Sequence, residues 1–571
     1  MLFGKNKKDE RRWIGEYEEG QRANLEYPTG SIVDALFDVA RKYPEYFAYE
    51  YFGNKVTFRT FAKQIENCAK ALKNYGVSKG DVVTICEPST PEGVIATYAT
   101  NLIGAVASMI HPLSSEKEIE NYILQSDSHI MFAIDMTIEK VMNIKKNTRL
   151  HKIIVTSPAS SMPPLLNSLY RVTNYKKKVK IPKDDDDIVQ WSTFINSAKN
   201  YVGVCYDSTK ADELAVILYS GGTTGTPKGI MLSNKAFNAV AMQAKEMISQ
   251  TIPGNVALCI LPIFHGFGLA VNVHTPLLCG MKVTLIPQFN AKEFNKLLKN
   301  TKPNFLVGVP TLYEALLKQK LGKRDLECVE AVISGGDLLP FELKKKVDEY
   351  LQEHGSNAKV RPGYGLTEST AAACLTKENE YEDGEIGIPF PDEYFKIVKI
   401  GTIEEAEPDE DGEICISGPT LMMGYLNNEK ESNEALRIHP DGRTWLHTGD
   451  IGAMTKNGHI IFKQRLKRMI ISSGYNIYPS YIENVILQHP DVQACTVIGK
   501  PHPYKGQVAK AYIVLKDDID VTGKIKKEIV ELCKKNVSIY AIPKEFEYRK
   551  SLPKTLVGKV AFRELEKENE E

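Results

Sequence analysis

The segment Glu213-Leu-Ala-Val-Ile-Leu-Tyr-Ser-Gly-Gly-Thr-Thr-Gly-Thr-Pro-Lys-Gly229 decides the fold class of this chain. Residues 213–219 form a compact apolar run, which is typical of a strand buried in a sheet. A glycine- and threonine-rich loop follows, and Ser233 can then cap a helix whose apolar positions between 236 and 248 recur at helical spacing. A buried strand that is followed by such a helix predicts layered α/β architecture.

The same alternation continues on both sides of this segment. Residues 31–40 read as a helix with Ser31 near its N-cap, and residues 81–86 read as a short buried strand. The last hundred residues change character: 494–499 and 508–515 read as strands, and 522–538 as an amphipathic helix. We therefore expect an α/β protein with a large N-terminal body and a small α+β C-terminal domain.

Composition excludes several classes of protein. The 571 residues carry 72 basic and 72 acidic side chains, with 43% hydrophobic and 25% charged residues. These values are those of a core-forming globular protein, and zero net charge argues against one that wraps nucleic acid. The ten cysteines include no CxxC pair, so we expect reduced thiols in a cytoplasmic protein rather than a zinc knuckle or thioredoxin-type site.

Two long uncharged stretches, 93–115 and 247–281, are the best candidates for membrane spans. Both contain polar side chains and prolines, which favour a buried helix and strands inside the core. In a third stretch, 163–187, a short apolar segment with Leu165, Leu166 and Leu169 is followed by a cluster of basic residues and then by four aspartates. A solvated surface excursion and a peripheral contact with anionic lipid through 163–182 both remain open.

The loop from Ser220 to Gly229 carries phosphate-binding chemistry. Glycines let backbone amides approach an anion, while the hydroxyls of Ser220, Thr223 and Thr224 can donate to phosphate oxygens. Lys228 supplies a point charge. A Walker A loop is excluded because proline precedes Lys228 and glycine follows it. The alternative is a plain hairpin turn.

This loop resembles the phosphate-binding signature of the adenylate-forming superfamily, which includes acyl-CoA synthetases, luciferases and peptide-synthetase adenylation domains. Seven further segments resemble that family's motifs in the family's order: 261–268, 333–337, 363–369, 412–418 with 423–427, 446–450, 465–483 and 553–559. The resemblance implies that ATP, Mg²⁺ and coenzyme A are used. It also implies a rotation of a C-terminal domain, 465–571, against an N-terminal domain, 1–464.

Roles for individual residues follow from the resemblance. Lys559 and Lys228 would neutralise charge during adenylation, Glu368 would hold Mg²⁺, Tyr364 would lie against adenine, and Asp450 would bind the ribose. The residues implied to bind ATP or coenzyme A are Ser220, Gly221, Gly222, Thr223, Thr224, Gly225, Lys228, Ser334, Gly335, Gly336, Gly363, Tyr364, Gly365, Thr367, Asp450, Arg465, Ser473 and Gly474.

Two segments need separate treatment. The resemblance places Phe264, His265 and Phe267 at the wall or gate of an acyl pocket, although a histidine in an apolar run is also typical of core packing. The hinge departs from the family's Gly-Arg-x-Lys-Asp, because Arg468 occupies the position that is expected to act as the pivot. Tyr481 and Phe562 replace residues that are usually Glu and Arg.

The implied reaction has two halves. A carboxylic acid is first adenylated by Mg·ATP with release of pyrophosphate, and coenzyme A then takes the acyl group and releases AMP. We favour a medium- or long-chain fatty acid as substrate. An aryl-acid CoA ligase of the coumarate type, or an adenylation protein that loads a separate carrier protein, remains an alternative. A non-catalytic, membrane-associated binding protein would not need Lys228, Glu368, Asp450, Arg465 and Lys559 together.

Overall fold

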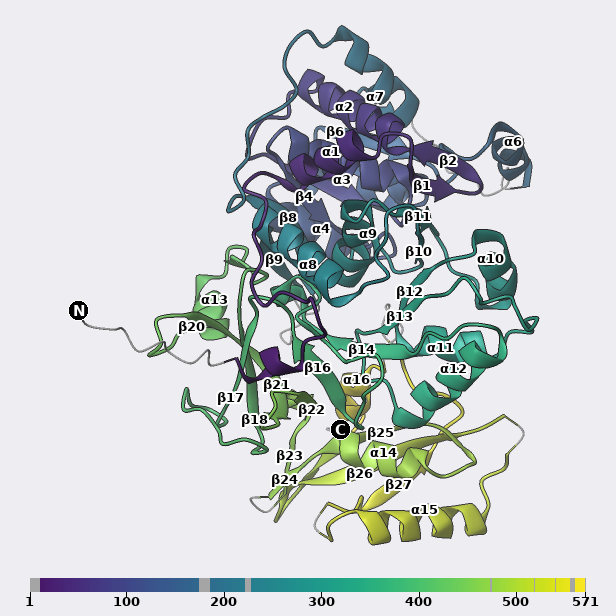
Figure 1. The fold of residues 1–571 in the computed structure, drawn as a ribbon, viewed down its shortest axis with the longest axis vertical. Coiled ribbons are helices and arrows are strands. Elements are labelled where there is room, and N and C mark those ends of the chain that lie inside the picture. The colour runs from purple at the N-terminus through teal and green to yellow at the C-terminus, as the bar shows by residue number, and fades with distance from the viewer. Residues whose placement is uncertain are drawn as a thin grey trace. The chain divides into compact units, whose positions relative to one another are not determined.

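The computed structural model describes residues 11–173, 185–220, 227–472, 475–517, 519–539, 541–554 and 560–569. The chain folds into two compact units (Figure 1). Unit 1 contains Met1–Phe395 and Ile416–Leu446, and unit 2 contains Lys396–Cys415 and His447–Glu571. Helices and sheets are layered in the large unit, and the small unit is α+β, so the predicted α/β class is confirmed.

One sheet of unit 1 contains the strand predicted at 213–219 and the strand that follows its loop. Its strands lie in the order β19-β9-β8-β4-β3-β5-β6-β7. Their bounds are β3 Val82–Cys86, β4 Val106–Met109, β5 Ile130–Ile134, β6 Lys152–Thr156, β7 Ile188–Gln190, β8 Leu214–Ser220, β9 Lys228–Ser233 and β19 Gly424–Tyr425. The strands predicted at 81–86 and 213–219 are confirmed as β3 and β8.

The loop after β8 closes a hairpin. Strands β8 and β9 pair antiparallel, with Ser220 opposite Lys228. Residues 221–226 between them lie outside the described part of the chain. A hairpin connection is compatible with both a plain turn and a phosphate-binding loop, because the two differ only in what the loop binds.

The second sheet of unit 1 is mainly parallel. From β14 it continues as β13-β12-β10-β11-β1, and β2 pairs antiparallel at its edge. Antiparallel β15 and β16 lie on the other side of β14. The bounds are β1 Phe47–Tyr51, β2 Asn54–Thr57, β10 Val256–Cys259, β11 Lys282–Leu285, β12 Phe305–Gly308, β13 Ala331–Ser334, β14 Val360–Tyr364, β15 Cys374–Leu375, β16 Glu385–Pro389, β17 Tyr394–Val398 and β20 Leu436–Ile438.

Several helices of unit 1 begin at residues whose side chains cap them. Ser31 and Asp34 form a capping box at the start of α1, and the Ser233 hydroxyl accepts the amide of Ala236 at the start of α8, as predicted. The bounds are α1 Ile32–Lys42, α2 Phe58–Asn74, α3 Pro91–Leu102, α4 Glu116–Ser126, α5 Ile138–Ile144, α6 Pro164–Thr173, α7 Trp191–Ser197, α8 Asn234–Met247, α9 Thr275–Leu278, α10 Phe294–Thr301, α11 Pro310–Leu317, α12 Phe341–Glu353 and α13 Glu429–Ala435.

The two uncharged stretches lie in the core, as predicted. The first forms α3, which is buried along its whole length, and β4. The second contains β10, an eight-residue π-helix labelled η6 (Phe267–His274), and α9. Among the described residues, no helix is long and apolar enough to cross a bilayer. All ten cysteines lie in the described residues and form no disulfide; seven of them are buried and three are partly buried.

Unit 2 is built on two groups of strands. The first contains β18 (Gly412–Ser417), β21 (Thr444–Met454) and β22 (Ile460–Arg465). The second has the order β24-β23-β26-β25, with β27 parallel to β26. The remaining bounds are β23 Ile470–Ser472, β24 Tyr475–Ile477, β25 Val492–His502, β26 Gly506–Leu515, β27 Glu545–Tyr548, α14 Pro479–Leu487, α15 Gly523–Asn536 and α16 Phe562–Lys567. The predicted strands and the helix with buried Ile525, Ile529 and Cys533 are confirmed.

Candidate functional site

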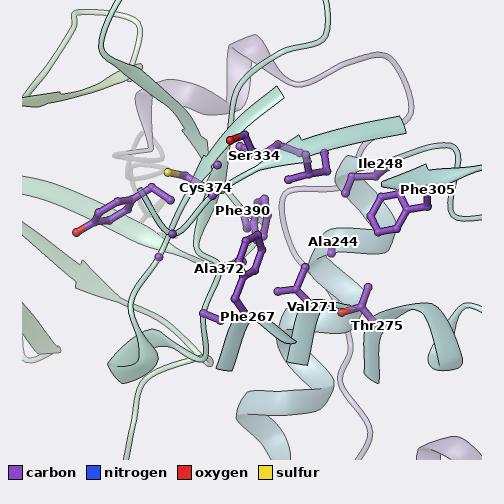
Figure 2. Close-up of a pocket in the computed structure, with 18 residues that line it drawn as sticks. Ala244, Ile248, Phe267, Val271, Thr275, Phe305, Ser334, Ala372, Cys374 and Phe390 are labelled. Atoms are coloured by element: carbon purple, nitrogen blue, oxygen red, sulfur yellow. The ribbon is translucent and has the colours of Figure 1, made fainter. Parts of the chain in front are cut away.

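Unit 1 contains a narrow apolar pocket with a cavity volume of about 30 Å³, within about 500 Å³ of space that includes open solvent. Figure 2 shows Ile248, Phe305 and Thr275 on one side, Ser334 and Cys374 on the other, and the ring of Phe267 between them. The full lining is Ala244, Ile248, Phe267, Val271, Thr275, Phe305, Ile333, Ser334, Gly335, Gly336, Gly363, Tyr364, Gly365, Ala371, Ala372, Cys374, Leu375 and Phe390. The structure thus joins three segments that are far apart in sequence.

Glycines form one wall of this pocket because side chains would not fit there. A Cβ on Gly335 would lie 2.9 Å from the ring of Phe267, and one on Gly365 would lie 2.5 Å from the carbonyl oxygen of Ala371. Gly336 has a φ of +78°, which disfavours other residues. Residues 334–336 and 363–365, which the resemblance assigns to ATP or coenzyme A with Tyr364 against the adenine, thus line this wall.

The opposite wall comes from the π-helix. Phe267 and Val271 of η6, with Thr275 just after it, line the pocket. Gly268 is required because a Cβ there would lie 2.0 Å from the carbonyl oxygen of Pro262. π-Helical turns are rare in proteins, and those that do occur are often found at functional sites. Sequence periodicity did not predict this one, because its apolar residues fit an α-helix equally well.

The three residues predicted for the acyl wall separate in the structure. Phe267 lines the pocket, whereas Phe264 and His265 are absent from its lining. Phe264 packs against the ring of His111, with centroids 4.1 Å apart. The Nδ1 of His265 accepts the backbone amide of Phe267 at 3.3 Å. His265 is therefore placed where it supports the turn into η6.

A polar cluster gathers four side chains beside β9. The ammonium of Lys228 forms an ion pair with Glu431 and lies 4.7 Å from the centre of the Tyr425 ring. The Tyr425 hydroxyl donates to Glu368 Oε1 at 3.0 Å. Burial, followed by the charge of Glu368, raises the pKa of Tyr425 well above its usual range, so this hydroxyl stays protonated as a donor. The predicted residues Lys228 and Glu368 thus belong to one linked cluster.

Glu368 reaches this cluster from a strained turn. It lies in η8 (Thr367–Ser369), and Thr370 and Ala371 after it have φ values of +51° and +77°. Two consecutive non-glycine residues in the left-handed region are unusual, and such strain clusters at functional sites. The Thr370 hydroxyl donates to the carbonyl of Thr420 at 2.7 Å, which helps to hold the turn. The turn connects the polar cluster to Ala371 in the pocket wall.

In unit 2, Asp450 lies beside Arg465 on paired strands. The two residues are opposite each other in β21 and β22, with Arg465 Nε 3.5 Å from Asp450 Oδ1. The carboxylate of Asp450 is almost fully buried, whereas Arg465 is 60% exposed. The structure therefore brings Asp450, which was predicted to bind the ribose, next to Arg465, which was predicted to bind ATP or coenzyme A.

The turn that carries Asp450 is held by a residue that sequence reasoning did not single out. Glu413 accepts the Gly449 amide at 2.9 Å through one oxygen and His447 Nδ1 at 2.8 Å through the other. The Thr448 hydroxyl donates to the carbonyl of Ile414 and accepts the amide of Asp450. Glu413 and His447 lie in quoted motifs, but their pairing across β18 and β21 is a tertiary contact.

The same Glu413 and His447 lie close to Cys415, and all three are buried with ligand atoms within 4.8 Å of one another. The hydrogen bonds of Glu413 to His447 and Gly449 already use both carboxylate oxygens. An ion bound through His447 Nδ1 would displace the bond from that nitrogen to Glu413, which helps to shape the Asp450 turn. We therefore assign the cluster to the support of this turn.

The remaining predicted positions lie elsewhere. Arg468 is anchored within unit 2 by an ion pair to Glu483, the carbonyl of Val497 and the ring of Phe562. The Tyr481 hydroxyl donates to the carbonyl of Asn536. Outside the described residues lie Gly221, Gly222, Thr223, Thr224, Gly225, Ser473, Gly474 and Lys559.

The layered α/β unit, the glycine-walled apolar pocket and the small α+β unit together have the architecture of the adenylate-forming enzymes. Residues 36–426 match the family described as AMP-binding enzyme, and residues 481–559 match the AMP-binding enzyme C-terminal domain. The chain therefore belongs to the AMP-binding enzyme family.

Individual relatives and solved structures agree with this assignment. The chain is 33% identical to a long-chain-fatty-acid–CoA ligase of Bacillus subtilis, over 98% of each chain. It is 30% identical to the luciferin 4-monooxygenase of Nipponoluciola cruciata, over 87% of this chain and 86% of that one. ATP-bound MatB from Rhodopseudomonas palustris has the same fold, with a TM-score of 0.81 at 22% identity over 95% of this chain and 99% of that one.

Proposed function

We propose that this enzyme is an AMP-forming acyl-CoA synthetase that acts on a medium- or long-chain fatty acid. The observation that carries the proposal is the apolar pocket, whose lining has no charged side chain and includes Ser334 to Gly336. An acyl tail would occupy the apolar part, because removing its surface from water is favourable by roughly 25 cal/mol per Å². Relatives named long-chain-fatty-acid–CoA ligases, 29–33% identical over at least 94% of this chain, support this substrate class.

In the first half-reaction, the acid attacks the α-phosphorus of ATP and pyrophosphate leaves. No general base is needed, because a carboxylic acid with a pKa of about 4–5 is ionised at neutral pH. What opposes the step is repulsion between a carboxylate and a polyanion. We assign Lys559 and Lys228 to reduce that repulsion, and Ser220 with residues 221–225 to hold the phosphates.

The Glu368 carboxylate fits the ligand preference of Mg²⁺, which takes oxygen donors. Its Oε1 accepts the hydroxyl of Tyr425, whose ring lies against the Lys228 ammonium. Mg²⁺ bound there would neutralise phosphate charge. For the nucleoside part of ATP, we assign Asp450 and Arg465 to the ribose and Tyr364 to the adenine. Thr367 precedes Glu368 in the same motif and is also assigned to ATP.

In the second half-reaction, the thiol of coenzyme A attacks the acyl carbon and AMP leaves. We propose that residues 465–571 form a mobile domain that presents Lys559 for adenylation and then Ser473 and Gly474 for thioester formation. A pivot near Arg468 would rely on backbone rotation, because the Arg468 side chain is fixed to Glu483 and Phe562. Closure of this kind also keeps water from a labile adenylate.

Pyrophosphate release tests the function directly. The full chain is mixed with ATP, Mg²⁺ and a panel of acids from C2 to C18, together with aromatic acids. We expect release to be greatest with medium- or long-chain acids and to continue with coenzyme A as acceptor. Preference for aromatic acids would favour the aryl-acid alternative, and acyl transfer to a carrier protein alone would favour the carrier-loading alternative. No release with any acid would favour a non-catalytic binding protein.

We further propose that the enzyme works in the cytoplasm, at the membrane surface, through α6. Leu165, Leu169 and Val172 on this helix are 82%, 58% and 74% exposed. Arg171 lies within α6, and the lysines that follow the helix in sequence lie outside the described residues; their charge suits anionic lipid. Exposed leucines on a short amphipathic helix are typical of peripheral lipid contact.

Liposome pelleting at low and high salt tests this contact. We expect the variant with both Leu165→Ser and Leu169→Ser to pellet less with anionic vesicles than the wild type. Leu124→Ser, which removes an exposed leucine from α4, serves as the matched control. Equal partitioning of all three proteins would show that α6 is a solvated surface helix.

A further inference from the structure

The ammonium of Lys228 is held by a carboxylate that lies outside all the quoted motifs. Glu431 forms an ion pair with Lys228, and both side chains are largely shielded, at 26% and 20% exposure. The face of the Tyr425 ring lies on the same ammonium, 4.7 Å from its centre. An ammonium between an aromatic face and a carboxylate is stabilised by both.

Glu431 is fixed in this position by its own helix. It lies in the first turn of α13, where its backbone amide donates to Oδ1 of the N-cap Asn428 at 3.2 Å. The next residue, Ser432, accepts the amide of Tyr425 at 2.8 Å and so ties α13 to β19. Strand β19 pairs with β9, the strand that begins at Lys228. The carboxylate is thus delivered to Lys228 by a rigid connection.

We propose that Glu431 is a counter-ion that competes with the phosphates of ATP and of pyrophosphate for Lys228. The inference rests on the proposed function, because that function assigns Lys228 to those phosphates. An ammonium that binds a phosphate oxygen must give up at least part of its interaction with Glu431. Phosphate binding therefore works against an existing ion pair, and release of pyrophosphate is assisted when Glu431 recovers Lys228.

Calorimetric titration of the full chain tests the competition. The probes are Mg²⁺ with a non-hydrolysable α,β-methylene ATP and, separately, Mg²⁺ with pyrophosphate. We expect Glu431→Gln to bind both probes about fivefold more tightly, the factor that corresponds to a partly shielded ion pair worth about 1 kcal/mol. Glu434→Gln removes an equal charge from the exposed side of α13 and should stay within about twofold of the wild type.

A double-mutant cycle separates direct competition from general repulsion. In a Lys228→Gln background, Glu431→Gln should no longer change the affinity for either probe. Unchanged or weaker binding by Glu431→Gln, or tightening that persists without Lys228, would overturn the inference. Glu431→Ala provides a second test, and thermal unfolding of each variant shows that it is folded. Failure of the wild type itself to bind the ATP analogue would instead overturn the proposed function.

Discussion

Glu413 offers the sharpest test of how the fold of unit 2 prepares the Asp450 turn. It is 7% exposed, and its two oxygens accept His447 Nδ1 at 2.8 Å and the Gly449 amide at 2.9 Å. Glu413→Ala removes both acceptors. A buried donor without an acceptor costs about 1–3 kcal/mol, and the imidazole can partly adapt by moving its proton to the other nitrogen. We therefore expect Glu413→Ala to lower the free energy of unfolding by about 3 kcal/mol.

That loss should be visible in two measurements. If the small unit unfolds cooperatively, a loss of about 3 kcal/mol lowers its Tm by about 6–12 °C. A looser Thr448–Asp450 turn should also raise the KM for ATP by about tenfold, equivalent to about 1.4 kcal/mol. Glu413→Gln keeps one acceptor oxygen and should lie between the wild type and Glu413→Ala. The exposed Glu405 in the same unit provides the control substitution, Glu405→Ala.

The two readouts can fail separately. A Tm within about 2 °C of the wild type would refute the hydrogen-bond argument. A lowered Tm with an unchanged KM for ATP would show that Glu413 supports the sheet but does not position Asp450.

Three further predictions concern the pocket, a buried carboxyl group and the C-terminal lysine. Gly268→Ala would place a Cβ 2.0 Å from the Pro262 carbonyl oxygen, so it should lower the free energy of unfolding by about 2 kcal/mol or more and reduce activity with long acids. The control is Gly266→Ala, whose Cβ contacts begin at 3.4 Å. It should change neither the unfolding free energy nor pyrophosphate release. Burial raises the pKa of Glu87 to about 8, so the stability that its proton provides is complete below the unfolded pKa near 4.5 and is lost as pH rises through 8. Between pH 6 and 8, denaturant titrations should show the wild type losing on the order of 2 kcal/mol more than Glu87→Gln, and parallel curves would contradict the assignment. Lys559→Ala should abolish pyrophosphate release but still convert supplied acyl-adenylate with coenzyme A; equal loss of both half-reactions would contradict its role.

Local patterns in the sequence predicted the elements whose cause is local. The apolar run before Ser220, the cap at Ser233 and the spacing of Ile525, Ile529 and Cys533 each identify an element from neighbouring residues alone. The order of the motifs predicted that the segments near 267, 334 and 364 bind the substrates of one enzyme. The pocket lining contains residues from all three segments.

Contacts between distant residues could not be read in the same way. The pairing of Glu413 with His447 and of Lys228 with Glu431 depends on which strands become neighbours, and no spacing in the sequence encodes that. Glu431 resembles any charged residue in the first turn of a helix, where a carboxylate is favourable in its own right. Its significance appears only when β9 and β19 are found to be paired.

The two histidines near the pocket show why a residue's surroundings matter more than its type. Sequence reasoning singled out His265, but the more buried one is His274, the last residue of η6. Its Nδ1 lies 2.9 Å from the Tyr98 hydroxyl and its Nε2 lies 3.2 Å from Asn238 Oδ1, and burial lowers its pKa to about 3. His274 therefore stays uncharged at neutral pH.

His274 lies directly before Thr275 of the pocket wall but is not part of the lining. Its ring nitrogens face Tyr98 and Asn238, and in its uncharged form it adds no charge to this part of unit 1. In the described part of unit 1, the charged groups of the proposed site instead gather around Lys228, Glu368 and Glu431, and the pocket lining carries none. This separation fits the proposed reaction, which needs an apolar surface for the tail and charged groups for the phosphates. An acid with a second charge at its far end should therefore be a poor substrate, which adding dicarboxylic acids to the panel would measure.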